Sequence, residues 1–441
     1  MDEKKLMEDA VATMSRYVQF DTTNPPGNEM PAALWLRDQL VSRNITSDIK
    51  IHEPIPGRGL VVARIAGTEG LKPLLINHHI DVVAADSSQW RYPPFAGAVA
   101  DGFVWGRGTL DTKGLGIMFL FALEALIKEG TRFRRSIVFT AVPDEEPGGD
   151  NGMRWLMKNH EKDIDPEWVW DEGSGGLKDV FGKGIMFAVA VAEKQIYRFK
   201  LIAKGEPGHG SMPHPGSANT LLIAALQRII DKPRPLKVGP AAAAMFAGLA
   251  STQKFPASFM LQHLANPLVL KLAGEKLAAE KFTNAVLRDT ISVNIIQAGY
   301  QINVIPERAE AQLDCRLLPE TDAKEFHRWL LGQIADERIQ IEMIQTSPPS
   351  GIAPTDNLFF QTVTETVKKH SPGAGVFPLL MAGATDGRYW RERGYPAYGF
   401  TPMILERMDL GRVHGIDERI SMDNLLLGIK MTKDIIRTLC T

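Results

Sequence analysis

Histidine and carboxylate side chains that could bind metal ions recur along the chain, in short segments rich in glycine or in further acids. A second carboxylate, Glu145, stands directly before one of these candidates. Two divalent ions held by histidine and carboxylate ligands, with a free carboxylate beside them, can activate water for hydrolysis. The residue types therefore favour a dinuclear metal-dependent hydrolase. Its potential metal ligands are His79, Asp111, Glu146, Glu172 and His414.

The first candidate ligand follows a predicted buried strand at residues 73–77. His79 and Asp81 are two residues apart, so on an extended chain their side chains point to the same face. His79 can then bind a metal through one ring nitrogen while Asp81 accepts a hydrogen bond from the other. The neighbouring His78 is the alternative ligand.

The acidic candidates also stand at the ends of predicted elements. Asp111 precedes a helix expected at 115–129, so helix capping is the alternative to a carboxylate that bridges two metals. The run Asp144-Glu145-Glu146 follows a strand expected at 136–142, and three adjacent acids need solvent or a cation to offset their repulsion. Ligands bind at the carboxyl ends of strands in open α/β sheets, which favours a site over a surface acidic turn. Asp171 and Glu172 follow a further strand, and periodicity does not decide which of the two faces a metal.

The elements that must position these residues alternate along the first part of the chain. Strands are expected at 59–65, 73–77 and 136–142, and helices at 6–20, 30–43 and 115–129. This alternation predicts an α/β fold, a mostly parallel twisted sheet with helices on both faces. From residue 196 the pattern changes to a small α+β unit, with strands at 197–203, 291–297, 309–317 and 339–344 and helices at 218–230 and 323–335. The first pattern resumes near 353, with helices at 357–369 and from 423.

We therefore predict a catalytic domain in two parts, residues 1–195 and 351–441, interrupted by a smaller domain at 196–350. Within the latter, residues 231–289 are rich in proline, alanine and apolar residues and predict a helical insertion. Two roles remain open for this insertion. It either covers the active site or packs in a dimer, or it adds a structural layer to the inserted domain.

Composition limits the class of protein. A chain of 441 residues exceeds one usual core, which also predicts two domains. The net charge of −2 gives no electrostatic case for a nucleic-acid or anionic-membrane partner. Two cysteines exclude a disulfide framework and a thiolate zinc site. The N-terminal stretch is amphipathic, and no apolar run reaches the roughly 20 residues of a membrane span, so we expect a cytoplasmic protein.

Taken together, the motifs resemble the aminoacylase/carboxypeptidase S/succinyl-diaminopimelate desuccinylase family of dinuclear zinc metallopeptidases. They occur in the family's order and span nearly the whole chain. The matching segments are His79-Ile80-Asp81-Val82-Val83, Gly106-Arg107-Gly108 with Asp111 and Lys113-Gly114, Asp144-Glu145-Glu146, Asp171-Glu172-Gly173, Gly208-His209-Gly210-Ser211, Asn303-Val304-Ile305-Pro306, Gly383-Ala384-Thr385-Asp386 and His414-Gly415.

The resemblance implies a role for each candidate ligand. His79 and Glu172 would hold one Zn²⁺, Glu146 and His414 the other, and Asp111 would bridge the pair. Glu145 would be the general base that takes a proton from the bridging water and delivers it to the leaving amine. Two Zn²⁺ per subunit are expected, and Co²⁺ or Mn²⁺ also suit such ligands.

The resemblance also assigns residues to substrate binding and assembly. The inserted domain would be a ferredoxin-like lid and dimerisation domain, and His209 would stabilise the oxyanion, often across a dimer interface. His214 is its near neighbour in the sequence. A substrate carboxylate would be held by Asn303, Arg316, Gly383 and Thr385, although Arg316 could equally form a structural ion pair.

We therefore expect a homodimeric hydrolase of the aminoacylase or carboxypeptidase type. Its substrates would be peptides with a free C-terminal carboxylate or N-acyl amino acids. The long insertion resembles the branch that includes carboxypeptidase S and N-acyl-amino-acid hydrolases, and its apolar character favours hydrophobic acyl groups. Alternatives are a biosynthetic deacylase, such as a desuccinylase or an acetylornithine-type deacetylase, and a non-catalytic metal- or ligand-binding protein.

Overall fold

A large, mostly parallel sheet organises the body of the molecule. The computed structural model describes residues 2–347 and 349–441. The sheet has ten strands in the order β1-β2-β6-β3-β7-β17-β9-β8-β18, with β16 also paired to β9. In that order the strands are β1 (Ile49–His52), β2 (Leu60–Ile65), β6 (Arg135–Val142), β3 (Leu71–His79), β7 (Trp168–Asp171), β17 (Ala397–Gly399), β9 (Ile185–Glu193), β8 (Gly176–Lys178), β18 (Ile404–Leu405) and β16 (Gly375–Met381).

The register of the central strands fixes where their carboxyl ends lie. β3 runs parallel to both neighbours, with His79 opposite Val142 of β6 and Ile76 opposite Trp170 of β7. All residues of β6 and β7 are buried, as expected for strands covered on both faces. The segments that follow β3, β6 and β7 therefore emerge together at one edge of the sheet.

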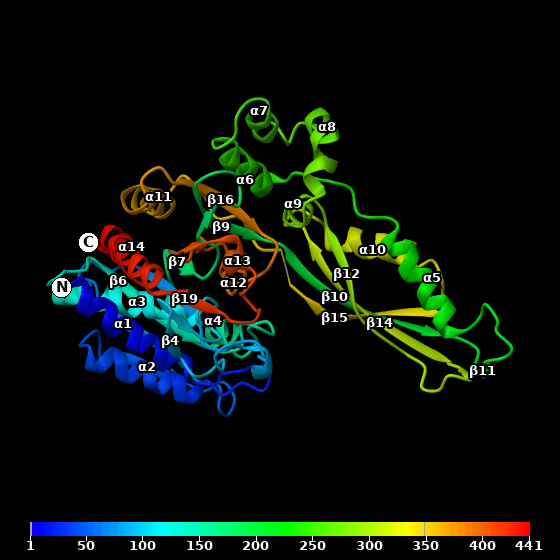
Figure 1. Cartoon of the computed structure of the whole chain (residues 1–441), viewed down its shortest axis with the longest axis horizontal. Coiled ribbons are helices and arrows are strands. Elements are labelled where there is room, and N and C mark those ends of the chain that lie inside the picture. Colours follow the sequence, from blue (N-terminus) through cyan, green and yellow to red (C-terminus); the bar gives the residue numbers. More distant parts are fainter. Residues whose placement is uncertain (1, 348) are drawn as a thin grey trace.

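Helices cover both faces of this sheet, as predicted (Figure 1). One face packs against α1 (Glu3–Val18), α2 (Met30–Ser42), α3 (Lys113–Lys128), α11 (Leu358–His370) and α14 (Met422–Cys440). The other packs against α4 (Met153–Asn159) and α12 (Gly387–Glu392). Smaller elements complete this body: η1 (Ser87–Gln89), η2 (Glu161–Asp163), α13 (Arg407–Leu410), and a three-stranded sheet of β4 (Ala98–Ala100), β5 (Phe103–Trp105) and β19 (Arg419–Ser421).

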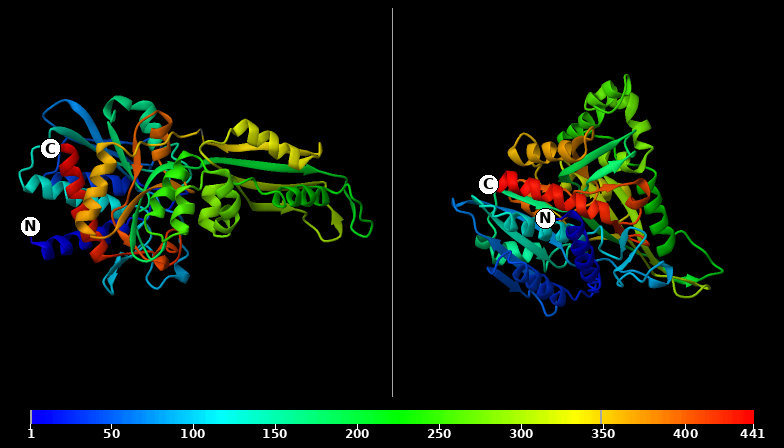
Figure 2. Two further views of the ribbon diagram at one scale, coloured as in Figure 1. Left: turned by 90° about the horizontal axis from the view of Figure 1, so that it is seen from above. Right: turned by 60° about the vertical axis from the view of Figure 1, so that its left-hand side comes forward.

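A second sheet forms an arm that extends from the body (Figures 1 and 2). It is antiparallel, in the order β12-β14-β10-β15. Its strands are β10 (Gln195–Lys204), β12 (Thr290–Ala298), β14 (Arg308–Leu317) and β15 (Ile339–Thr346), and it packs against α5 (Ala218–Ile230) and α10 (Ala323–Ile334). The chain order βαββαβ with this strand order is the ferredoxin-like arrangement that we expected. A short pair, β11 (Gly208–His209) with β13 (Val304–Ile305), forms the far tip of the arm.

Four helices of residues 231–289 pack against the large sheet. They are α6 (Pro240–Ala250), α7 (Ala257–Gln262), α8 (Pro267–Ala278) and α9 (Lys281–Leu287). Met245 and Phe246 of α6 share one buried cluster with Ala188 of β9 and Phe377 of β16. The insertion thus joins the base of the arm to the outer strands of the body. Among the described residues, no helix combines the length and the apolar character that a membrane crossing requires.

Candidate metal centre

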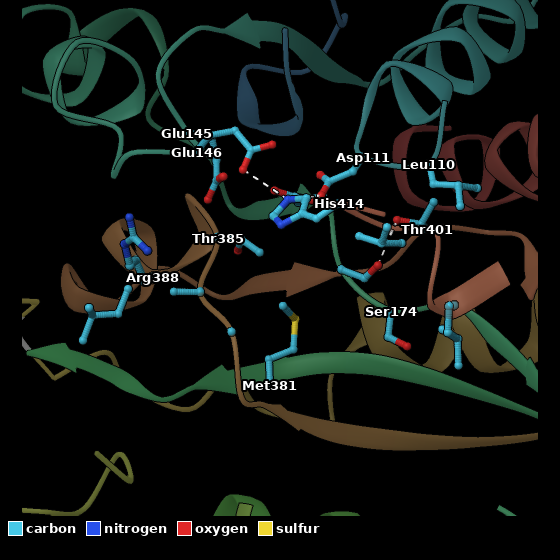
Figure 3. Close-up of a pocket in the computed structure, with 18 of the residues that line it drawn as sticks. Leu110, Asp111, Glu145, Glu146, Ser174, Met381, Thr385, Arg388, Thr401 and His414 are labelled. Atoms are coloured by element: carbon cyan, nitrogen blue, oxygen red, sulfur yellow. Dashed lines mark hydrogen bonds and ion pairs between the residues drawn. The ribbon is translucent and has the colours of Figure 1, made fainter. Parts of the chain in front are cut away.

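The side chain of Asp111 lies at the centre of the candidate site. Its Oδ1 atom is 2.8 Å from Nε2 of His79, and its Oδ2 atom is 2.9 Å from Nε2 of His414. His414 Nε2 is also 3.2 Å from Oε2 of Glu146, and His79 Nε2 is 3.5 Å from Oε1 of Glu172. The five predicted ligands therefore converge, and Figure 3 shows the acids around the ring of His414.

Each of these residues stands at the end of an element. His79 is the last residue of β3, Glu146 follows β6, Glu172 follows β7, and Asp111 precedes α3. His414 lies between α13 and β19 with a φ of +59°, a left-handed conformation that is uncommon outside glycine. Such outliers cluster at functional sites, where the surrounding structure holds them in place.

The donor set fits two divalent cations that share one carboxylate. Donor atoms of His79, Asp111 and Glu146 lie within 4.8 Å of one another, as do those of His79, Glu145 and Glu172. Burial raises the pKa of Glu172 well above its ordinary value, because a charged carboxylate is poorly solvated there and other acids lie close to it. A cation would offset both effects, and mixed imidazole and carboxylate donors suit zinc, cobalt and manganese.

The two adjacent histidines have different surroundings. His78 is buried in the core, where its Nε2 lies 3.0 Å from the Tyr17 hydroxyl, and burial lowers its pKa to about 3. Burial alone would also lower the pKa of His79, but the nearby carboxylates of Glu172 and Asp111 outweigh this effect and raise it. Only His79 of the pair thus faces the acids of the site.

The expected contact of Asp81 needs a correction. Nδ1 of His79 lies 2.8 Å from the backbone oxygen of Asp81 but 3.6 Å from its carboxylate. The backbone carbonyl therefore orients the ring and leaves Nε2 free for a metal. The carboxylate instead accepts the backbone N–H groups of Glu145 at 3.1 Å and Glu146 at 3.2 Å. It also accepts a bond from Asn24 at 2.8 Å, so Asp81 holds the acidic turn in place.

The three acids that follow β6 have different surroundings. Asp144, at a φ of +72°, pairs with Arg58 at 3.0 Å. Glu146 faces His414. Among the described residues the carboxylate of Glu145 forms no hydrogen bond or ion pair, although the residue is only 9% exposed. Burial, with smaller effects from neighbouring charges, raises its pKa well above the ordinary value.

The geometry also separates Asp171 from Glu172. Asp171 Oδ1 accepts a hydrogen bond from Asn77 at 2.8 Å, inside the sheet. Glu172 lines the pocket and faces His79. The sequence did not show which of Asp171 and Glu172 faces the site. The alternation of side chains along the strand turns Glu172 toward it.

Sequence reasoning missed the residue that supports the backbone of Asp111. Glu418 is fully buried, and its Oε1 accepts the backbone N–H groups of Leu110 at 2.7 Å and Asp111 at 3.2 Å. Its Oε2 pairs with Arg107 at 2.7 Å. Arg107 belongs to a motif quoted above, but nothing in the sequence links it to an acid more than 300 residues later.

A pocket of about 400 Å³ opens beside the ligands. Of the predicted substrate-binding residues, Arg316, Gly383 and Thr385 line it. Arg316 also pairs with Asp314 at 2.7 and 3.1 Å. The Thr385 hydroxyl donates to Glu193 at 2.7 Å, so we correct the expectation that it donates to a substrate.

The remaining two predicted residues lie elsewhere. His209 and Asn303 are at the tip of the arm, where the backbone N–H of Gly210 donates to the Asn303 carbonyl at 2.8 Å. His209 is exposed, and its Nδ1 lies 2.8 Å from the Ser211 hydroxyl. Neither His209 nor Asn303 lines the pocket, and the structure does not bring them to the ligands within one subunit.

Comparison with known proteins places this arrangement in a family. The sequence model of peptidase family M20/M25/M40 matches residues 75–438, which include all five predicted ligands. The chain belongs to this family. The resemblance stated from the motifs is therefore confirmed, and a member of a peptidase family with clustered ligands is an enzyme that acts on amide bonds.

Individual relatives of this M20 chain support the same conclusion. It is 31% identical over 400 residues to an N-fatty-acyl-amino acid synthase/hydrolase of Xenopus tropicalis, covering 89% of this chain and 77% of the relative. It is 32% identical over 365 residues to a probable carboxypeptidase S-like protein of Dictyostelium discoideum, covering 81% and 69%. A solved M20 metallo-carboxypeptidase of Sulfolobus solfataricus shares the fold, with a TM-score of 0.75 at 19% identity over 97% and 98% of the two chains.

Proposed function

We propose that this M20 protein is a dinuclear metal-dependent amidohydrolase that releases an amino acid from a peptide or an N-acyl amino acid. The observation that carries the proposal is the placement of Asp111, with one carboxylate oxygen facing each of two histidines. This arrangement would provide two neighbouring cation sites, and Glu145, whose carboxylate has no partner among the described residues, lies within reach of one of them.

The cations would be held by residues from both parts of the body. We assign His79 and Glu172 to one site, Glu146 and His414 to the other, and Asp111 to both. Bound Zn²⁺ would supply Lewis-acid activation of water and of the substrate carbonyl. The chain's own task is to orient these ligands, through the Asp81 carbonyl on His79 and through Glu418 on the Asp111 backbone.

Glu145 is our candidate for proton transfer. Its raised pKa brings a carboxylate closer to the pH at which it can both take and return a proton. In this assignment it takes a proton from the attacking water and delivers it to the amine nitrogen as the amide bond breaks. Asp144 is unsuited to this task because it is paired with Arg58.

The arm is proposed as a lid and dimerisation domain formed by residues 196–350. The tip residues His209 and Asn303 would reach the active site of a partner subunit in a homodimer. There His209 would donate to the oxyanion that forms when water attacks the carbonyl. A His209→Ala variant that keeps full turnover, or an enzyme that is fully active as a monomer, would contradict this assignment.

The pocket lining supports an apolar group on the substrate. Beside the candidate ligands it carries Leu177, Met381, Met403, Leu405 and Val413, while Arg198, Arg316 and Arg388 provide positive charge. An N-acyl amino acid combines an apolar acyl group with a carboxylate, and one relative is named for such substrates. A biosynthetic deacylase remains the alternative, favoured by the three arginines, which also suit a succinyl carboxylate.

The test is amino-acid release from matched N-acetyl, N-succinyl and long-chain N-acyl amino acids and from dipeptides, before and after chelation. We expect chelator-sensitive turnover, restored by Zn²⁺, with the long-chain acyl substrates preferred. Preference for the succinyl substrate would shift the assignment to a biosynthetic deacylase. Bound metal without turnover on any substrate would indicate a binding protein.

A further inference from the structure

The insertion carries exposed apolar side chains on the surface that faces away from the large sheet. Phe255, two residues before α7, is 81% exposed, and Phe259 within α7 is 52% exposed. Leu268 is 72% exposed and Leu272 79%, one turn apart on α8. We refer to these four residues as the insertion patch. A residue of this size and exposure is unremarkable singly, but clustered ones mark interaction surfaces.

The packing of these helices explains why the patch stays exposed. Their other apolar residues, Met260 and Leu261 of α7 and Val269 and Leu270 of α8, are partly buried against the core that includes β9 and β16. The side chains of the insertion patch point away from this core and remain exposed to solvent. Figure 1 shows α7 and α8 at the outer margin of the molecule.

The charges that adjoin the patch residues in the sequence are positive. From Leu236 to Gly274 the sequence contains Lys237, Lys254 and Lys271 and no acid. Lys254 adjoins Phe255, and Lys271 adjoins Leu272. The exposed Lys183 lies in a neighbouring loop, which Gln253 ties to the insertion through the Phe181 carbonyl at 2.9 Å. The next acid along the chain, Glu275, pairs with Arg288 at 3.3 Å.

We propose that the insertion patch docks the enzyme onto an anionic lipid surface. Short helices that present bulky apolar residues flanked by lysines insert those residues at the boundary between headgroups and acyl chains, while the lysines attract anionic headgroups. The overall charge of −2 does not exclude this, because the interaction acts within about a Debye length, roughly 8–10 Å. Docking does not depend on the reaction proposed above.

A second copy of the chain is the competing occupant of the patch. A self-interface would have to bring Lys254 and Lys271 close to their own counterparts or to acids elsewhere, and no acid lies in this stretch to complement them. An anionic membrane provides that complement over its whole surface. The charge pattern therefore favours lipid.

The test is co-sedimentation of the full-length protein with vesicles of phosphatidylcholine alone and of phosphatidylcholine with phosphatidylserine. We expect binding to the anionic vesicles only, weakened by salt. The Phe255→Ser/Phe259→Ser/Leu268→Ser/Leu272→Ser variant should lose it, and Lys254→Gln/Lys271→Gln should weaken partitioning roughly fivefold per lysine. Val41→Ser/Val99→Ser and Lys4→Gln/Lys5→Gln are matched surface controls that should bind as the wild type does.

Several outcomes would overturn the proposal. These are absence of binding to either vesicle, equal binding by the patch variant, or loss of binding in the controls as well. Light scattering without lipid tests the competing occupant, a second copy of the chain. A patch variant with a lower molar mass than the wild type would show that the patch forms a self-interface. Turnover of a short, soluble N-acyl amino acid should be unchanged in the patch variants, because none of the substituted residues lines the pocket.

Discussion

Replacement of Glu145 by glutamine tests the proposed general base most directly. The substitution keeps the size of the side chain but replaces the carboxylate by a neutral amide, which cannot accept and return a proton. The turn should persist, because it is held through the backbone N–H of Glu145 and the carboxylate of Asp81 at 3.1 Å. Folding and the positions of the ligands should therefore be preserved, so a loss of turnover would report on the chemistry.

The size of the loss follows from what surrounds Glu145. General acid–base catalysis contributes about 10²–10⁴ in rate, equivalent to roughly 2.7–5.5 kcal/mol of barrier. Neither neighbour in the acid run is free to replace it, since Asp144 is paired with Arg58 and Glu146 faces His414. We therefore expect kcat to fall toward the upper end, about 10³–10⁴-fold.

The assay is kcat and KM on an N-acyl amino acid, with bound metal measured by elemental analysis of the same samples. Wild-type turnover should be lost as the pH falls through the raised pKa of Glu145, since the base must be deprotonated. A loss below tenfold would refute the assignment. Loss of bound metal would instead make Glu145 a ligand, which its position within 4.8 Å of donor atoms of His79 and Glu172 allows. The matched control is Glu146→Gln, which should lose metal as well as activity.

Three further predictions concern the support of the site and the junction between the sheets. Asp81→Asn places an amide opposite the N–H groups of the acidic turn, so metal affinity should fall about 10–100-fold in a competition titration. Unchanged affinity would show that the backbone carbonyl of residue 81 suffices. Glu418→Gln leaves the buried Arg107 charge without its partner and should cost about 3 kcal/mol or more in urea unfolding. The matched control Glu406→Gln removes an exposed pair with Lys178 and should leave the urea midpoint nearly unchanged. Equal costs would contradict this reasoning. Burial lowers the pKa of Lys194 from 10.5 to about 7. Between these two pH values the folded protein binds fewer protons than the unfolded chain, so the free energy of unfolding should rise with pH. Lys194→Met should flatten that rise, and a wild type whose stability falls over this interval would contradict the prediction.

Much of the fold could be predicted because its periodic segments are long and their ends are marked. The helix predicted at 218–230 has those bounds in α5, which Ser217 caps by accepting the Thr220 N–H at 3.2 Å. β9 was not assigned from the sequence. Its residues are buried on both faces, so its apolar run lacks the alternation that marks a strand.

The site was predictable where chemistry is local in sequence and not where it depends on distant contacts. The acid run 144–146 and the pair His79 and Asp81 are visible in the sequence as motifs. Their partners Asn24 and Arg58 are not, because they are dozens of residues away in the sequence. The same holds for Glu418, which supports the Asp111 backbone from more than 300 residues away. The choice between Asp171 and Glu172 depends on the phase of one strand, which the neighbouring β3 and β17 fix.

The junction of the two sheets bears on how the arm could take part in catalysis. β9 ends at Glu193 and β10 begins at Gln195, so Lys194 alone connects them. Lys194 Nζ donates to the carbonyls of Ala285 at 2.7 Å and Arg288 at 2.9 Å, and Gln195 donates to three carbonyls that follow β14. Both side chains are buried.

These contacts tie the base of the arm to the end of an insertion that is itself packed on the body. A swing large enough to carry the exposed His209 from the tip into the pocket of its own subunit would break several buried hydrogen bonds, each costly to leave unmade. A second subunit whose arm tip reaches this site requires no such rupture. We therefore expect turnover per subunit to fall with dilution, in step with dissociation of the proposed dimer. Mixing the inactive His209→Ala and Glu145→Gln variants should restore activity. In a mixed dimer the subunit that keeps Glu145 would receive the intact His209 of the other subunit.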